Sequence, residues 1–302
     1  MSRIALVLAL LGALPAAAQE GALDVLDGET LFEGGWLFTL GIERERREGL
    51  LDGSRSVSDP FDRAQTDQSV TLSAHYGLRH DLQLTAILPY VRRELALDDP
   101  AGPDRLTGEG TGDFTAVAKW RFYRWSEPHR VLNVALIGGL ELPTGATDER
   151  DGGARLPPSL QPGSGSWDPL LGVGATYEPY RWRFNAFAVY KVSGEGTRAF
   201  NAGEEFHAEL AVGNRFWLEP YPGPFMRFDV MLRYRHTGRS TAGGRTVDDS
   251  GGDLWTVGAN FAFRPRPTID LQIAVEVPIA ERVNGLQLEQ DYSVFLVFGF
   301  RI

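Results

Sequence analysis

The sequence predicts an all-β protein, a transmembrane antiparallel up-and-down β-barrel of about twelve strands with short periplasmic turns and long extracellular loops. Apolar and polar residues alternate in short segments along the chain, as the two-residue period of a strand with one lipid-facing side requires. The connections between these segments alternate between short and long, a rhythm that a soluble β-sandwich does not explain. The chain also ends on a segment, 292–302, in which every second side chain is apolar.

The N-terminus has the features of a secretory signal peptide. Arg3 precedes an apolar run over residues 4–14, and small residues follow it. The run is too short for a membrane-spanning helix, which needs roughly 20 residues. We therefore expect a signal peptide over residues 1–18, a short periplasmic leader over residues 19–35, and a barrel over residues 36–302. Because such a leader is too short to fold into a plug domain, we expect only loops or lining side chains to occlude the lumen.

The strands follow from the alternation in chain order. The first, 36–45, places Trp36 on the lipid side and Glu43 on the opposite side, and a long polar loop follows it. The next two, 70–78 and 82–90, are joined by a tight turn. The same rhythm of long loop, strand, short turn and strand then continues. Further strands are expected at 114–122, 132–142, 171–177, 182–190, 206–212, 228–234, 255–263 and 269–277, with a last loop before 292–302.

The alternation also predicts which side of each strand meets lipid. In the segment 132–142, Leu136 is expected to face lipid and Ile137 the lumen, so a charge should be costly at Leu136 and tolerated at Ile137. Aromatic residues gather where girdles at the two membrane–water interfaces are expected. They are Tyr76, Phe122, Tyr123, Trp125, Tyr177, Tyr180, Trp182, Phe216, Trp217 and Tyr221 beside the short turns, and Tyr90, Tyr190, Tyr234 and Tyr292 beside the long loops.

Composition narrows the class of protein further. The 302 residues include 35 glycines and no cysteine, and the formal net charge is −10. A chain without cysteine suits an oxidising envelope compartment, where a stray thiol risks mispairing. The acidic balance and the lack of a basic stripe argue against a nucleic-acid partner.

No segment has the spacing of a catalytic, cofactor or metal site. Residues 108–112 are rich in glycine but open a strand rather than a helix, so they do not form a phosphate-binding fingerprint. The five histidines lack metal-ligand spacing, and the acidic segment 148–152 lacks the spacing of a calcium loop. Ser73 and His75 share an inward face, but nothing marks them as an activated nucleophile and its base. We therefore expect no catalytic residue, no metal and no cofactor.

Charged residues recur on the predicted inward faces. A barrel of eight strands is filled by its side chains and one of sixteen or more encloses a channel, so a barrel of about twelve strands allows two interpretations. In one, the charges form salt bridges in a nearly closed lumen. In the other, they line a narrow pore whose basic stripe prefers anionic or polarisable solutes. The lumen-lining candidates are Lys119, Arg121, Glu141, Arg183, Lys191, Glu209, Arg227, Asp229, Arg233 and Arg235.

Three blocks of sequence carry a family resemblance over residues 108 to 218. They are GTGDF at 110–114, LELPTG at 140–145 and WDPLLGVG at 167–174. In this order they resemble the outer-membrane family labelled "MetA-pathway of phenol degradation". The resemblance implies an outer-membrane transporter that passes small molecules, including hydrophobic or aromatic ones. It supplies no catalytic residues.

We therefore expect a passive outer-membrane channel in a Gram-negative-type bacterium, with a structural or phospholipase-like enzymatic barrel as the alternative. The expected partners are outer-membrane lipids, a small-molecule solute and the barrel-insertion machinery. The last strand, 292–302, resembles the terminal signal that this machinery reads in outer-membrane proteins.

Overall fold

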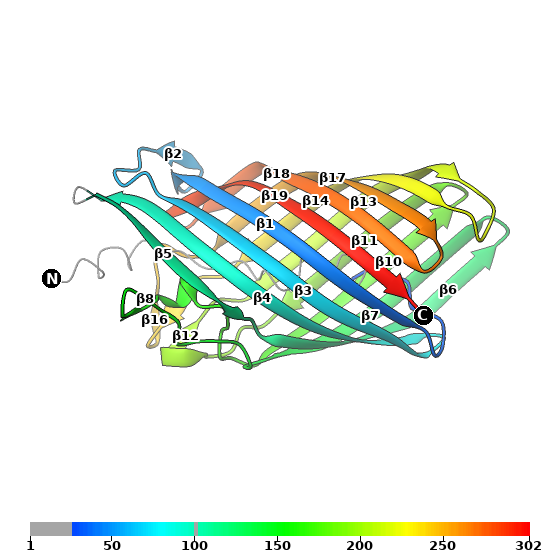
Figure 1. The fold of residues 1–302 in the computed structure, drawn as a ribbon, viewed down its shortest axis with the longest axis horizontal. Coiled ribbons are helices and arrows are strands. Elements are labelled where there is room, and N and C mark those ends of the chain that lie inside the picture. The colour runs from blue at the N-terminus through cyan, green and yellow to red at the C-terminus, as the bar shows by residue number, and fades with distance from the viewer. Residues whose placement is uncertain (1–25, 100–101) are drawn as a thin grey trace.

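The chain forms a closed antiparallel β-barrel (Figure 1). The computed structural model describes residues 26–99 and 102–302. Each wall strand pairs with the next, and the last pairs with the first, with Phe38 opposite Phe300. The prediction of a barrel of about twelve antiparallel strands is confirmed. The wall strands are β1 (Trp36–Asp52), β3 (Ala64–Arg79), β4 (Leu82–Asp99), β6 (Phe114–Glu127), β7 (Arg130–Leu142), β10 (Asp168–Pro179), β11 (Trp182–Lys191), β13 (Glu205–Leu218), β14 (Phe225–Thr237), β17 (Gly252–Arg266), β18 (Ile269–Val283) and β19 (Leu286–Arg301).

The two ends of the barrel differ in the length of their connections. Short turns, such as the one between Arg79 and Leu82, lie at the end that holds the C-terminus, on the right in Figure 1. Because outer-membrane barrels place their short turns in the periplasm, this is the periplasmic end. No helix within the described ranges is long and apolar enough to cross a membrane. The connections at the other end carry the small elements β2 (Arg55–Val57), β5 (Gly102–Thr111), β8 (Arg150–Asp151), β9 (Ala154–Arg155), η1 (Pro158–Leu160), η2 (Thr197–Ala199), β12 (Phe200–Asn201), β15 (Thr241–Ala242) and β16 (Arg245–Thr246).

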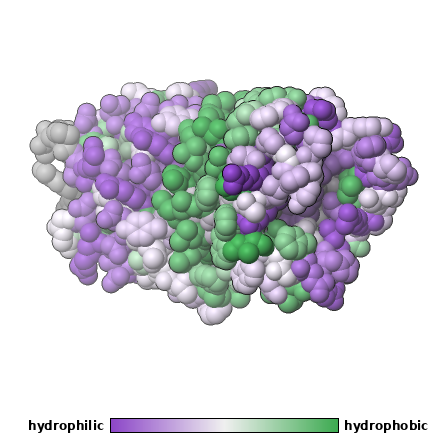
Figure 2. Space-filling model, turned by 45° about the vertical axis from the view of Figure 1, so that its right-hand side comes forward, coloured by the Kyte–Doolittle hydropathy of each residue, from purple (hydrophilic) through white to green (hydrophobic). Residues whose placement is uncertain are grey.

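The outward faces of the strands form an apolar belt, seen as a green band across the middle of Figure 2. In β7, Leu136 exposes 43% of its surface and its neighbour Ile137 exposes 0%, which confirms the predicted facing. Exposed apolar area of this extent is unfavourable in water, whereas a closed barrel satisfies all its backbone hydrogen bonds inside a bilayer. The protein is an outer-membrane β-barrel.

Several strands are longer than the sequence predicted. β1 continues to Asp52 and β4 to Asp99, through segments expected to be loops. These extensions have polar residues on both faces, and ion pairs connect them, such as Arg47 Nη1 to Asp67 Oδ2 at 3.7 Å. Apolar alternation stops where the wall leaves the membrane, but the backbone hydrogen bonds continue. Hydropathy alternation therefore marks the membrane boundary and not the end of the strand.

The expected last loop before the C-terminal strand is wrong. β18 ends at Val283 and β19 begins at Leu286, so only Asn284 and Gly285 connect them. Gly285 has a φ of +64°, a conformation that favours glycine, and it lies in the tight bend between the two strands. Beyond Glu276 and Ser293 the two strands pair with their outer neighbours, β18 with β17 and β19 with β1. Charged and polar residues such as Glu281 and Gln290 interrupt the apolar alternation there, so the hydropathy pattern did not show these strand ends.

Apolar side chains fill part of the barrel interior. One cluster lies on the inner side of the wall, and Leu26 and Phe187 pack against it. The expectation that lumen positions tolerate charge therefore does not extend to Ile137, because this side chain lies in a packed apolar environment. The cluster consists of Ile87, Val117, Ile137, Leu170 and Val189.

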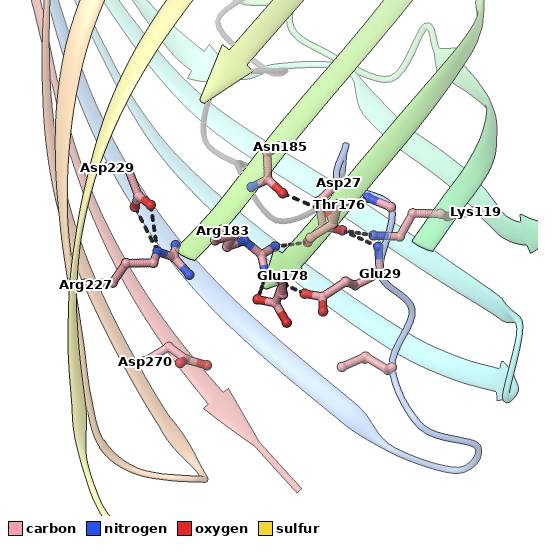
Figure 3. A network of polar contacts seen from close by, with 12 residues as sticks. Asp27, Glu29, Lys119, Thr176, Glu178, Arg183, Asn185, Arg227, Asp229 and Asp270 are labelled. Carbon is pink, nitrogen blue, oxygen red and sulfur yellow. Dashed lines mark hydrogen bonds and ion pairs between the residues drawn. The ribbon is translucent and has the colours of Figure 1, made fainter. Parts of the chain in front are cut away.

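Part of the expected leader lies inside the barrel. Residues 26–35, here called the strap, precede β1 and run along the inner side of the wall (Figure 3). The Gly28 amide donates to Thr176 Oγ1 at 3.0 Å, and the Leu31 amide donates to Gln83 Oε1 at 3.0 Å. The expectation that only loops and lining side chains would occlude the lumen is therefore wrong. The expected signal peptide, residues 1–18, lies outside the described residues.

Candidate functional site

The periplasmic half of the lumen contains a cavity of about 480 Å³, here called the vestibule. Basic side chains dominate its lining, and the acidic ones are Asp27, Glu29, Glu178 and Asp270. The basic side chains are Lys119, Arg121, Arg124, Arg183, Arg215, Arg227, Arg264 and Arg301. The vestibule is therefore cationic although the whole chain carries a net charge of −10.

The strap supplies two of these acidic groups. Asp27 lies between two cations of the wall, with Oδ1 2.6 Å from Lys119 Nζ and Oδ2 2.9 Å from Arg183 Nη2 (Figure 3). Glu29 Oε2 accepts from Arg183 Nη1 at 2.7 Å, and Glu178 Oε1 accepts from the same nitrogen at 2.8 Å. Lys119 and Arg183 are 1% and 6% exposed. Their charges need nearby anions, because a buried charge without a partner is strongly unfavourable.

Glycines in the wall and in the strap make this docking possible. A Cβ on Gly77 in β3 would overlap the carbonyl oxygen of Phe32, and a Cβ on Gly174 in β10 would overlap that of Leu26. A Cβ on Gly28 would lie 2.5 Å from the carbonyl oxygen of Asn133. The strap therefore approaches the wall more closely than any side chain allows.

The electrostatics favour the docked strap over a wide pH range. Burial alone would raise the pKa of the Glu29 carboxyl, but the charge and hydrogen bond of Arg183 outweigh it. The charges of Arg215 and Lys119 act in the same direction, and the pKa falls from 4.5 to about 2. Glu29 is therefore ionised at any pH that an outer membrane meets.

On the opposite wall of the vestibule, cations and an aromatic ring alternate. Asp270 pairs with Arg264 and, through Oδ2, with Arg301 at 2.9 Å. The guanidinium carbons of Arg215 and Arg264 lie 5.6 and 4.8 Å from the centre of the Phe225 ring. Distances of this size are typical of cation–π contacts. This wall therefore offers both charge and aromatic surface.

Nearer the extracellular end, the inward cations are paired with acids of the wall. Arg233 Nε contacts Glu209 Oε2 at 2.5 Å, and its Nη1 contacts Glu276 Oε1 at 2.5 Å. Lys191 Nζ lies 3.0 Å from Glu205 Oε1 and 3.7 Å from Glu141 Oε2. At this level the arrangement fits the salt-bridged interpretation of the lumen.

The long connection between β7 and β10 folds over the extracellular mouth. Asp113 holds it in place, because its carboxylate accepts from the Gly145 amide at 2.7 Å and the Ser164 amide at 2.6 Å. Arg93 donates to the carbonyl of Gln161. A small cavity of about 90 Å³ remains beneath this cover. Leu156 and Leu160 of this connection pack against Leu95 and Leu97 of β4 in an apolar cluster.

The candidates predicted from the sequence lie at two levels of the interior. Asp229 pairs with Arg227 Nε, with Oδ1 at 2.8 Å. Asp27 and Glu29 were missed, because a leader without strand periodicity gave no reason to place it in the lumen. The inward glycines were the available signal, since Gly77 and Gly174 leave room for a second backbone. The candidates that line the vestibule are Lys119, Arg121, Arg183 and Arg227, and those above it are Glu141, Lys191, Glu209, Arg233 and Arg235.

The Ser73 and His75 pair does not form a hydrolytic site. The Ser73 hydroxyl has no hydrogen-bond partner among the described residues. His75 instead contacts Thr85 Oγ1 at 3.1 Å and Thr39 Oγ1 at 3.5 Å. Over the described part of the chain, no group of three or more His, Asp or Glu side chains could hold a metal ion.

Comparisons with known proteins extend this description. The family model described as "Putative MetA-pathway of phenol degradation" matches residues 63–287. No curated protein matches the chain. Among solved structures, an outer-membrane channel from Pseudomonas putida F1 has a TM-score of 0.68 at 18% identity, covering 91% of this chain and 98% of that one. A monoaromatic hydrocarbon channel has a TM-score of 0.43 at 10% identity, covering 97% and 98%. The likeness to the Pseudomonas putida channel agrees with the barrel fold described above.

Proposed function

Because the chain belongs to the family described as the MetA pathway of phenol degradation, we propose that it is an outer-membrane channel for the passive passage of small solutes, including hydrophobic or aromatic compounds. The observation that carries this proposal is the vestibule, which places a large cationic cavity inside a closed barrel, with an apolar cluster beside the strap above it. A solute with a polar group and an apolar body finds complementary surface on both. The outer-membrane channel from Pseudomonas putida F1, which has a similar barrel fold, agrees with this proposal.

The strap stands in the path of such a solute. Its backbone docks against Thr176 and Gln83, and Leu26 reaches the apolar cluster. We therefore expect the docked state to conduct poorly, and passage to require displacement of the strap. This differs from a hatch domain, because a single extended segment fills the path.

Planar-bilayer recording of the purified protein tests the proposal. We expect low conductance for the unaltered protein and clearly larger, stable conductance after deletion of residues 26–32, which removes the part of the strap that contacts the inner wall. Deletion leaves every wall strand intact. A matched control replaces Arg239 and Asp248, two exposed residues of an extracellular connection, by glycine and should keep the low conductance. Absence of conductance in both variants, together with measurable phospholipid hydrolysis, would support the enzymatic alternative instead.

A further inference from the structure

We propose that the vestibule is a binding site for a small aromatic carboxylate, and that Asp27 and Glu29 of the strap are built-in competitors for its cations. The proposal deepens the proposed function and rests on it for its physiological meaning. Binding at equilibrium, however, requires no transport. The two proposals can therefore fail separately.

The first argument is the balance of charge around the cavity. Eight basic side chains line the vestibule against four acidic ones, and two of the four belong to the strap. Without the strap, the lining would contain eight basic side chains and only two acidic ones, Glu178 and Asp270. Lys119 and Arg183 are almost fully buried, so they would need another anion in place of the strap. The wall therefore provides a site for a negatively charged group, and the carboxylates of the strap occupy this site.

The second argument is the geometry of the Asp27 carboxylate. One oxygen contacts Lys119 Nζ at 2.6 Å and the other contacts Arg183 Nη2 at 2.9 Å. A free carboxylate can bridge the same two donors, and charge-assisted hydrogen bonds of this length are strong. The Nε–H of Arg183 is buried and has no hydrogen-bond partner among the described residues. An incoming carboxylate thus finds a further donor that the strap does not use.

The third argument concerns the apolar body of the ligand. Phe32 lines the same cavity and exposes 64% of its surface, so its ring is available to a ligand. Phe225 lies across the cavity beneath two guanidinium groups. A planar ring can stack on these surfaces, and about 480 Å³ is within the range of small-molecule sites. An anion without a ring, or a ring without a charge, uses only part of this surface.

The strap is also suited to displacement. It adds no strand to the wall, and beyond the carboxylates its hydrogen bonds to the wall include those of the Gly28 and Leu31 amides and of the Thr30 hydroxyl. Its C-terminal end stays attached, because the Gly34 amide donates to the Gly77 carbonyl at 2.8 Å. Residues 26–31 can therefore leave the cations while the barrel remains closed.

Equilibrium binding of benzoate to the detergent-solubilised, full-length protein tests the proposal, with benzamide as the uncharged probe and acetate as the probe without a ring. We expect weak benzoate binding to the unaltered protein and binding tighter by about tenfold in the Asp27→Asn, Glu29→Gln double variant, an effect of one decade in Kd. Benzamide and acetate should gain little. Glu33→Gln is the matched control, because Glu33 is an exposed strap carboxylate outside the lining of the vestibule.

Two further measurements make the result decisive. Adding Lys119→Gln to the double variant should return benzoate affinity to that of the unaltered protein, because one of the two released donors is lost. In a protein spin-labelled at Thr30→Cys, within the part of the strap that leaves the cations, benzoate should raise the mobile fraction of the strap and benzamide should not. Equal benzoate affinity in the unaltered protein and a correctly folded double variant would overturn the proposal. Benzamide that binds as tightly as benzoate would also overturn it. If the double variant does not fold, the spin-label measurement decides, and a strap that stays immobile in the presence of benzoate would overturn the proposal.

Discussion

At the scale of single residues, ion pairs across the lumen stabilise the barrel. Arg233 joins Glu209 on β13 to Glu276 on β18, and its side chain is 13% exposed. Arg233→Glu should destabilise the barrel by about 3–5 kcal/mol, because it places three carboxylates together in a water-poor interior. The midpoint of urea unfolding, followed by the shift between folded and unfolded bands on gels, measures the loss. Arg239→Glu is the control, since Arg239 is 49% exposed and lies 3.7 Å from an exposed Asp248; equal shifts in the two variants would contradict the argument.

The facing of neighbouring residues in β18 gives a second prediction. Ile273 is 44% exposed on the lipid side, whereas Gln272 lines the vestibule. Ile273→Arg should cost about 2–4 kcal/mol near the bilayer midplane, while Gln272→Arg should cost little. Urea unfolding in lipid vesicles compares the two. Leu136 and Ile137 are not a suitable pair for this test, because the packed cluster around Ile137 makes charge costly on both sides of β7. Similar losses of stability at Ile273 and Gln272 would mean that the lumen is closed at this level.

At the scale of elements, the wall could be predicted from the sequence and the strap could not. A membrane strand needs apolar side chains on its lipid-facing side, so alternation located all twelve wall strands, each within its observed bounds except for Ile302 after the end of β19. The strap lacks periodicity, since its position depends on Asp27, Glu29 and inward glycines of distant strands. The extracellular hairpins were missed for a related reason. Where the strands stand in water, charged residues such as Arg92 and Glu94 take the outward positions, so the apolar outward face that marks lipid contact ends there.

The strap also makes a prediction about pH. The pKa of Glu29 is lowered from 4.5 to about 2, so its contribution to docking is complete above 4.5 and is lost only as the pH falls through about 2. A nitroxide on Thr30→Cys, next to Glu29 in a chain with no other cysteine, reports strap mobility. We expect an unchanged spectrum from about pH 7 to about pH 4, with a mobile fraction growing only near the folded-state pKa. Adding Glu29→Gln should remove this pH dependence, and a transition centred near 4.5 would show that Arg183 does not hold Glu29.

At the scale of the whole molecule, the charge of the interior opposes that of the chain. The net charge is −10, yet eight cations face four acids in the vestibule. The variant lacking residues 26–32 should therefore be anion-selective, because the deletion removes two of those acids. The reversal potential in a potassium chloride gradient measures this selectivity.

A charge reversal within the vestibule sharpens that measurement. Arg215→Glu in the strap-deleted background should shift the reversal potential toward cations, since Arg215 lines the cavity and loses its pairing with Glu178. Arg92→Glu serves as the control, because Arg92 lies on the β4 extension with its side chain 50% exposed. An equal shift in both variants would assign selectivity to the surface field of the barrel rather than to the vestibule.

Because the strap is covalently attached, a solute must exceed a threshold concentration before it can displace the carboxylates of the strap. Asp27 precedes β1 by only a few residues, so its effective concentration at Lys119 and Arg183 is on the order of millimolar or higher, as for other short tethers. A solute that is scarce outside the cell cannot outcompete a rival that never diffuses away. A solute that becomes abundant can. The outer membrane would then stay tight under dilute conditions and admit the compound once it accumulates, without a receptor, a partner protein or an energy source.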